Sequence, residues 1–334
     1  MTKIILGTAK LGWDISNKNY NNQIKVIEFF LKKNYQIHIS ANYGYSLNRI
    51  RKIKILSKSK SSFLLKISFN NQESFIHELI YSSMMIGSNK KIDIQIDESF
   101  QTKNLVSLLQ TIQITKNLTN INKILFTPMT YNQNEFLKKN FSKFDFTIHY
   151  SFVERSVNNN LLSNKKSRKI IALRALGKGF RNFSFDDFYK KKTRYNHKKL
   201  NKTLLKLNLS ELEARALYVF NNKSLSKVVI STSKLKNLFE LFKLEKKKLE
   251  IKKWKILERY SIKNFTIKKT SKPLYQNSFT KKHNPQIFFK SLNFLRKKNL
   301  ISKRYFLVGI YHLNIGLINL LINFFKIKII SLLK

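Results

Sequence analysis

The 334-residue chain contains no cysteine, which excludes disulfide bonds, zinc sites built on thiolates and catalysis by a thiol nucleophile. Proline and glycine are scarce, with 3 and 8 residues respectively. Acidic residues are also few, 18 Asp and Glu against 65 Lys and Arg, which gives a formal net charge of +47. The N-terminus turns polar too soon after its first lysine to hold the apolar region of a secretory signal. We therefore expect a cytoplasmic protein whose N-terminal residues form the first strand.

The positive charge has two explanations. A field of this size attracts nucleic acid or an anionic membrane surface. However, lysine, asparagine, isoleucine, phenylalanine and tyrosine crowd every part of the chain, as an AT-rich coding sequence produces. Because the lysines are scattered and form no single stripe, we favour the compositional explanation. It does not fully explain why acidic residues are so few, so weak anion binding stays open.

Short apolar runs alternate with longer helical patterns from Lys3 to about Leu241. This alternation predicts repeated βα units and a parallel sheet covered on both faces. Eight such strands predict a (β/α)8 TIM barrel. The alternative is an open doubly wound sheet. It is less favoured because no Gly-x-Gly-x-x-Gly motif follows the first run. The predicted strands are Ile4–Gly7, Gln36–Ser40, Phe63–Ser68, Ile92–Ile96, Lys123–Phe126, Phe144–Ile148, Lys169–Leu173 and Lys227–Ser231.

The chain divides into three predicted parts, a barrel over residues 1–245, a basic linker over 246–284 and a C-terminal basic helical extension over 285–334. The linker is rich in charge and lacks the strand and helix alternation. In the helical tail, Tyr305–Phe325 carries no formal charge unless His312 is protonated, but asparagine and glycine interrupt it. We favour a helix packed on the barrel or on a partner over a helix on the membrane surface, and both over a membrane span.

Six pieces of the barrel segment resemble the aldo/keto reductases, and they occur in the family's order. The family writes Asp-Thr-Ala-x-x-Tyr-Gly-x-Ser-Glu at the end of its second strand, and Ser40, Tyr43, Gly44 and Ser46 fall into register with it, as does the lysine of the third strand, Lys66. Each piece is weakly specific, and the ordered set is more so. The pieces are LGTAKLGW (Leu6–Trp13), IHISANYGYS (Ile37–Ser46), FLLKIS (Phe63–Ser68), KIDIQIDE (Lys91–Glu98), IALRALGKGF (Ile171–Phe180) and VVISTSKLKNL (Val228–Leu238).

The resemblance implies reduction of a carbonyl by hydride transfer from NADP or NAD, at the C-terminal ends of the strands. Hydride transfer leaves negative charge on the substrate oxygen, which must be protonated as it forms. Tyr43 matches the family's acid, and Lys66 matches the ammonium that lowers the pKa of that phenol. The residues that the resemblance assigns to the cofactor are Gly7, Thr8, Ala9, Arg174, Gly177, Gly179, Ser231, Ser233 and Lys234.

Two of the family's four catalytic positions carry a different residue type. His38 stands where the family has an aspartate, and the fourth strand ends in Asp97 or Glu98 where the family has a histidine. One hypothesis is that these groups have exchanged places, so that Asp97 pairs with Lys66 and His38 is the imidazole of the pocket. The alternatives are a barrel whose tetrad is no longer maintained, and slow catalysis by Tyr43 and Lys66 alone.

The function favoured by these observations is an NAD(P)H-dependent oxidoreductase acting on a small carbonyl or sugar-like substrate, impaired if the altered tetrad is not functional. The alternative is a catalytically inactive barrel scaffold that binds RNA or a membrane surface through its basic residues. No metal site is expected, because His149 and Asp145 are too isolated and the other histidines lack ligand spacing. The substrate and the oligomeric state are not decided by the sequence.

Overall fold

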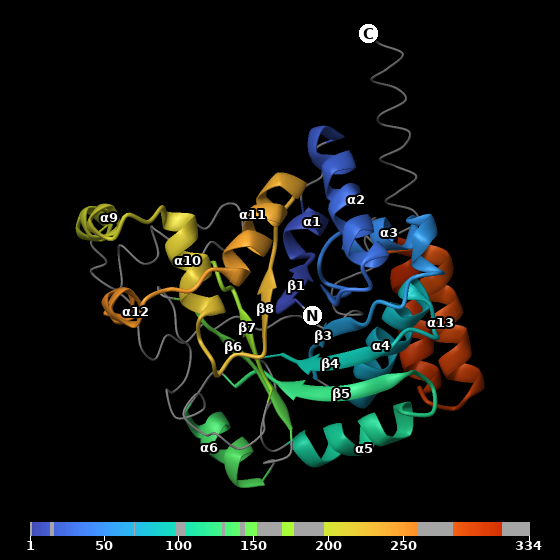
Figure 1. Cartoon of the computed structure of the whole chain (residues 1–334). Coiled ribbons are helices and arrows are strands. Elements are labelled where there is room, and N and C mark those ends of the chain that lie inside the picture. The colour runs from blue at the N-terminus through green and yellow to red at the C-terminus, as the bar shows by residue number, and fades with distance from the viewer. Residues whose placement is uncertain are drawn as a thin grey trace.

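The computed structural model describes residues 2–13, 17–69, 71–97, 104–128, 131–140, 144–151, 169–176, 197–259 and 283–315. At its centre is a closed barrel of parallel strands that follow one another in chain order (Figure 1). The predicted (β/α)8 barrel is therefore confirmed, and each strand overlaps its predicted run. The strands are β1 (Ile4–Gly7), β2 (Ile37–Ile39), β3 (Phe63–Ile67), β4 (Ile92–Ile96), β5 (Ile121–Phe126), β6 (Asp145–His149), β7 (Ile170–Leu173) and β8 (Lys227–Ile230).

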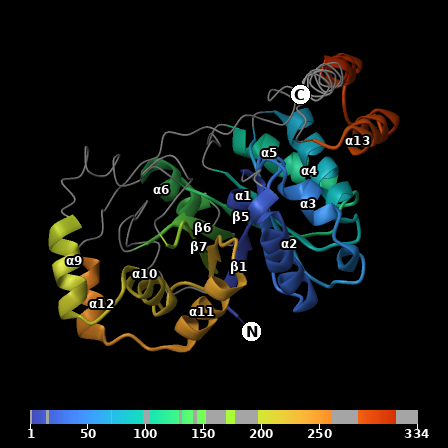
Figure 2. The same cartoon turned by 90° about the horizontal axis from the view of Figure 1, so that it is seen from above.

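Helices surround this barrel, as the view from above shows (Figure 2). Local signals set several of their ends. Ser210 and Glu213 form the capping box that begins α10, and Asn284 caps α13 ahead of Pro285. The described helices are α1 (Ala9–Trp13), α2 (Asn17–Lys32), α3 (Ser46–Arg51), the 3-10 turn η1 (Lys54–Leu56), α4 (Gln72–Ile86), α5 (Leu105–Thr115), α6 (Tyr131–Asn140), α9 (His197–Lys206), α10 (Glu211–Phe220), α11 (Leu235–Lys246), α12 (Ile251–Glu258) and α13 (Pro285–Lys297).

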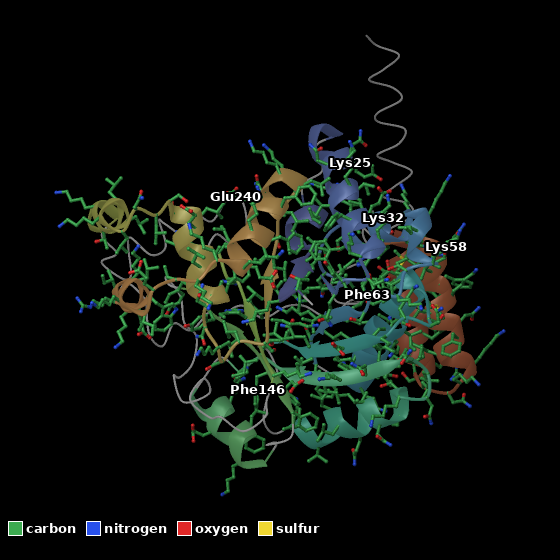
Figure 3. All side chains as sticks on the ribbon, in the orientation of Figure 1. Lys25, Lys32, Lys58, Phe63, Phe146 and Glu240 are labelled. Carbon is green, nitrogen blue, oxygen red and sulfur yellow. The ribbon has the colours of Figure 1, made fainter. Side chains whose placement is uncertain are left out.

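Alternate residues of each strand pack in two different places. One set joins the main core between strands and helices, to which Phe63 and Phe146 belong (Figure 3). The other set forms a separate buried cluster, which marks the axis of the barrel because successive strand residues point to opposite faces. Lysines such as Lys25, Lys32 and Lys58 project outward (Figure 3). The axial cluster is Ile5, Leu64, Leu125, Ile171, Leu173 and Val229.

A polar layer closes the end of the barrel where the strands begin. Gln36 Nε2 donates a hydrogen bond to Asp93 at 2.6 Å, and Lys227 Nζ donates to Gln36 Oε1 at 2.6 Å. Lys123 pairs with Asp145 across 3.2 Å. These polar groups satisfy one another at the end of the barrel that lies opposite the C-terminal ends of the strands.

The helical tail packs on α4. Tyr305 OH lies 3.2 Å from His77 Nδ1, and Ser291 Oγ lies 3.1 Å from His77 Nε2. Tyr81 OH accepts a hydrogen bond from Asn284 N at 3.0 Å. Figure 1 shows α13 beside α4 at the edge of the barrel. Of the placements considered for the tail, packing on the barrel is the one observed for residues 283–315.

Part of the predicted linker is also helical. Trp254 of α12 stacks on Tyr218 of α10 with ring centroids 4.9 Å apart, and its Nε1 donates to Tyr218 O at 3.0 Å. Residues 260–282 lie outside the described part of the chain, so the limits of the linker and tail stay predictions. Among the helices that the structure describes, none is long and apolar enough to cross a membrane.

Burial of His77 makes the stability of the fold dependent on pH. Burial, and the neighbouring His283 to a lesser extent, lower the pKa of His77 from 6.5 to about 3. The folded state therefore keeps this imidazole neutral where the unfolded state takes up a proton. We expect the free energy of unfolding to fall as pH drops below 6.5, by about 1.4 kcal/mol per pH unit from this group, until the folded pKa is reached.

Thermal unfolding between pH 4 and pH 8 tests this expectation. The substitution His77→Gln keeps one donor and one acceptor without the titration, so its unfolding temperature is expected to fall less at acid pH than that of the unsubstituted chain. His312→Gln, at a half-buried histidine of the same tail, is the matched control. Equal acid dependence of the His77→Gln variant and the unsubstituted chain would contradict this assignment.

Candidate active site

Predicted site residues converge at the mouth of the barrel, defined as the C-terminal ends of its strands. His38 lies between Ile37 and Ile39, which both belong to the outer core, so it shares the face of the axial cluster. The same alternation places Lys66 two residues after the axial Leu64. The alternation of strand residues also places Gly7 of β1, Ser231 after β8 and Asp97 after β4 at this end of the barrel interior.

Tyr43 lies in the loop after β2, against the ring of His38. The two ring centroids are 5.5 Å apart with an interplanar angle of 80°, an edge-to-face contact. The loop is a tight turn in which Tyr43 N donates to Ser40 O at 3.1 Å, and Gly44 adopts a positive φ of 55°. The family-like run after the second strand therefore folds so that its tyrosine and its histidine lie together.

Gly12 supports this loop, and the sequence motif alone did not single it out. The loop lies directly on α1, where Tyr45 N donates to Gly12 O at 3.0 Å. A Cβ atom at Gly12 would stand 1.6 Å from Tyr43 O, so no other residue fits without moving the loop. The sequence shows Gly12 in LGTAKLGW, but its contact with the loop of Tyr43, about thirty residues further along the chain, depends on the closed barrel.

Asp97 is fully buried at the end of β4. Ser68 Oγ donates a hydrogen bond to Asp97 Oδ2 at 2.6 Å. Asp97 N also donates to Ile67 O at 3.0 Å, which continues the pairing of β3 with β4 beyond Ile96. Asp97 therefore follows β4, the strand that pairs with the strand of Lys66. Glu98, the other predicted carboxylate, lies outside the described residues, so the choice between the two stays a prediction.

A second buried acid, Glu78 of α4, lies within electrostatic reach of these groups. Burial raises its pKa well above the usual value, the charge of Asp97 raises it further and the charge of Lys66 lowers it. Neither oxygen of the Glu78 carboxyl has a hydrogen-bond partner. Sequence reasoning missed this residue, because a glutamate in QESFIHELI resembles the solvated face of an amphipathic helix, and only tertiary packing buries it.

The predicted cofactor residues near β1 are packed tightly together. A Cβ atom at Gly7 would stand 2.5 Å from Ser231 Oγ, so these two positions touch across the β1–β8 pair. Thr8 is fully buried, and its N and Oγ1 donate to His38 O at 3.1 and 2.8 Å. Ala9 begins α1. This segment therefore joins the ends of β1, β2 and β8.

The loop after β8 leads into α11 and carries the other predicted cofactor residues. Lys234 N donates to Thr232 Oγ1 at 3.3 Å, and no side chain caps the N-terminus of α11. Ser233 is half-buried and Lys234 is exposed. Uncapped backbone N–H groups at a helix N-terminus suit an anionic group such as a phosphate.

Other predicted cofactor residues are placed only in part. Arg174 follows β7 with a positive φ of 54°, at the same end of the barrel. Gly177 and Gly179 lie outside the described residues. Within the residues described, no group of three or more His, Cys, Asp or Glu side chains could hold a metal ion.

β4, the end of β5 and β6 add further polar residues to the interior. Gln95 Nε2 donates to Thr127 Oγ1 at 3.1 Å, and Thr127 Oγ1 lies 2.6 Å from Thr147 Oγ1. His149, at the end of β6, is buried and alternates with Ile148 of the outer core. The sequence analysis considered His149 only as a metal ligand. The alternating run DFTIH was the signal that it faces the mouth.

Comparison with known proteins shows a shared fold and no sequence relative. No protein-family model matches the chain, and no curated protein matches it by sequence. A glycerol dehydrogenase from Gluconobacter oxydans is similar in structure, with a TM-score of 0.59 and 14% identity over 78% of this chain and 91% of that one. A thermostable aldo-keto reductase in complex with the inhibitor epalrestat gives a TM-score of 0.61 and 13% identity over 78% and 95% of the two chains.

An aldo/keto reductase from Klebsiella pneumoniae, in complex with NADP and acetate, gives a TM-score of 0.56 and 8% identity, over 78% of this chain and 91% of that one. At these identities the likeness concerns the fold. The resemblance found in the sequence is confirmed at that level, and this chain has the barrel fold of the aldo/keto reductases.

Gly12→Ala tests the support of the Tyr43 loop. The added methyl group would collide with the backbone of Tyr43, so we expect destabilisation of about 1–3 kcal/mol, as is usual for overpacking, and displacement of the tyrosine ring from His38. Denaturant unfolding measures the first effect, and NMR of ring-labelled tyrosine measures the second. Gly309→Ala is the matched control, because its methyl group meets only the movable side chain of Leu292. A Gly12→Ala variant as stable as the control would refute this role.

Proposed function

We propose that this chain is an NAD(P)H-dependent oxidoreductase of the aldo/keto reductase type that reduces a small carbonyl or sugar-like compound. The observation that carries the proposal is the convergence at the mouth of the barrel. There, the Tyr43 ring lies against His38, and Lys66 and Asp97 both act on one buried carboxyl. Active sites of this fold lie at that end.

Each side chain has a distinct task in the proposed reaction. Tyr43 donates the proton that the substrate oxygen needs as negative charge develops on it. The Lys66 ammonium favours the phenolate and so lowers the pKa of the phenol. In the exchange hypothesis, His38 orients the substrate oxygen and Asp97 holds Lys66 in place. A nicotinamide cofactor, when bound, supplies the hydride.

The residues of two loops fit the nicotinamide dinucleotide. Ser231, Ser233 and Lys234, with the uncapped N-terminus of α11, offer donors and positive charge to its phosphates. Gly7, Thr8 and Ala9 would border its nicotinamide, with contributions from Arg174 and, beyond the described residues, Gly177 and Gly179. NADP is proposed ahead of NAD, because a structural neighbour is a complex with NADP.

The alternative function is a catalytically inactive scaffold in the cytoplasm. The net charge of +47 and the outward lysines favour an anionic partner such as RNA or a membrane surface (Figure 3). Such binding would be independent of sequence and would weaken steeply with salt, since it depends on counterion release. Failure to bind NADPH, together with RNA binding of this kind, would replace the oxidoreductase proposal by the scaffold.

Tyr43→Phe tests the proposed acid. We expect the affinity for NADPH, measured by fluorescence titration, to change little, because the cofactor phosphates are held elsewhere. Turnover of a small aldehyde panel should fall by about 10²–10⁴-fold, the usual contribution of a general acid.

Tyr45→Phe, at a half-buried tyrosine of the same loop, is the control and is expected to keep its turnover. Equal loss in both variants would show that the loop matters only for folding. Unchanged turnover in Tyr43→Phe would remove Tyr43 from the chemistry.

A further inference from the structure

The helix described over residues 303–315, the tail helix, is covered on one side. Tyr305 and Gly309 lie one helical turn apart on this side, and both are buried. Tyr305 OH lies 3.2 Å from His77 Nδ1 of α4, and a Cβ atom at Gly309 would stand 2.7 Å from the side chain of Leu292 of α13. One face of the tail helix therefore packs on α4 and α13.

The opposite side of the tail helix carries two large apolar side chains. Leu307 and Tyr311 lie one turn apart, and 54% and 62% of their surfaces are exposed. Arg304 and Asn314, both exposed, extend this stripe at its two ends with the spacing of a single helical face. We call these four residues the outer face. Single exposed apolar residues are common, but large ones that share a face mark an interaction surface.

The charge around the outer face has one sign. The 18 acidic residues of the chain all lie at or before Glu258, so the charged residues of the later sequence are all basic. In the described part of the tail, Lys290, Lys297, Lys298 and Lys303 are exposed. A composition that spreads lysine evenly along the chain does not explain why acidic residues stop at this point. The tail therefore combines exposed apolar side chains with positive charge that none of its own residues balances.

Contacts at the start of the tail helix hold the outer face in place. Ser302 Oγ accepts a hydrogen bond from Tyr305 N at 3.1 Å, which caps the helix, and Glu73 of α4 accepts one from Ser302 N at 2.5 Å. α13, on which the tail helix packs, lies at the outer edge of the molecule in two perpendicular views (Figure 1, Figure 2). A partner therefore meets a face that is already ordered, which lowers the cost of binding.

We propose that the outer face is a docking surface for an anionic lipid membrane. Leu307 and Tyr311 enter the boundary between headgroups and acyl chains, while Arg304 and the exposed lysines of the tail contact the headgroups. The tail helix then lies along the membrane surface, as amphipathic helices with a basic polar side do. This proposal goes beyond the proposed function, since it holds whether or not the barrel reduces a carbonyl.

The chemistry of the outer face fits a lipid surface better than RNA or a second copy of the chain. The aliphatic side chain of Leu307 gains from contact with hydrocarbon and has nothing to offer a phosphate backbone. A tyrosine such as Tyr311 is favoured at the membrane interface, where its ring is buried and its hydroxyl reaches water. Lysine stems lie along apolar surface while their ammonium groups meet lipid phosphates. A second copy would bring the same positive charge against itself.

The sequence after the described part of the tail helix has a similar composition. Residues 316–334 are mostly apolar, and their only charged residues are Lys326, Lys328 and Lys334. A segment that combines apolar with basic residues and contains no acid suits an anionic lipid surface. The outer face is therefore followed along the chain by residues of matching chemistry.

A fluorescent label at position 307 tests the contact directly. Because the chain has no cysteine, Leu307→Cys allows an environment-sensitive dye to be attached at one place. Vesicles of phosphatidylcholine with phosphatidylserine should shift its emission to the blue as the dye enters the interface, and phosphatidylcholine alone should shift it less. Val106→Cys, at a residue of α5 that is 68% exposed, is the control and should show no shift. An equal shift at both positions, or none at position 307, would overturn the proposal.

Vesicle sedimentation at about 0.15 M salt measures the apolar contribution. Leu307→Asn combined with Tyr311→Asn should weaken partitioning onto the anionic vesicles by about 10- to 100-fold, since both side chains lose their burial in lipid. Val106→Asn combined with Ile114→Asn, at two exposed residues of α5, is the matched control and should partition like the unsubstituted chain. Partitioning that is unchanged in the tail variant would contradict the proposal.

The same measurement separates local charge from the net charge of the chain. Lys303→Gln combined with Arg304→Gln should weaken partitioning by about 5-fold for each charge removed. Lys25→Gln combined with Lys32→Gln, at exposed lysines of α2, removes the same charge elsewhere and should weaken it less (Figure 3). An equal loss in the two pairs would mean that the vesicles attract the chain as a whole, and the outer face would then have no special role.

The other possible occupants of the outer face give different results. If Leu307→Asn with Tyr311→Asn weakened RNA binding and not vesicle binding, the face would belong to RNA. If light scattering showed a dimer that the same variant dissociates, the face would belong to a second copy, and either result would overturn the proposal. None of these variants is expected to change the affinity for NADPH. Failure of the oxidoreductase function would therefore leave membrane docking untouched, and failure of docking would leave the oxidoreductase function untouched.

Discussion

The site depends on closure of the parallel sheet into a cylinder. Because strand residues alternate between two faces, closure turns one residue in two toward a common axis, and parallel pairing brings all the C-terminal ends to one mouth. Apolar side chains such as Leu64 and Leu125 fill the middle of that axis. The polar layer around Gln36 and Asp93 lies at the far end, and the predicted site residues His38, Lys66 and Asp97 lie at the mouth.

Burial of charge is the second constraint. In a chain with 65 basic and 18 acidic residues, several described carboxyls hold defined contacts, such as Glu213 in the capping box of α10 and Asp145 with Lys123. Glu78 and Asp97 differ from these because both are buried next to the mouth, on neighbouring elements. Burial raises the pKa of Glu78 well above its usual value, and buried ionisable groups with a shifted pKa occur most often at functional sites.

The fold and the chemistry are supported to different degrees. The structural neighbours establish the barrel, but a barrel hosts many reactions, so the reaction must be argued from the site. His38 and Asp97 stand where the aldo/keto reductases have an aspartate and a histidine, so an imidazole and a carboxyl both still lie at the mouth of the barrel. The tail adds a constraint outside the barrel, since His77 anchors it to the helix that also carries Glu78.

The sequence by itself determined the order of strands and helices, the capping box at Ser210 and the run that contains Tyr43, because these depend on periodicity, hydrogen bonding and turn chemistry between near neighbours. The strands on which His38, Lys66 and Asp97 lie were predictable for the same reason. Only the tertiary structure decided that Gly12 lies beneath Tyr43, that the tail packs on α4 and that Glu78 is buried. Each of these joins segments far apart in the chain, whose contact depends on three-dimensional closure and packing that no local pattern records.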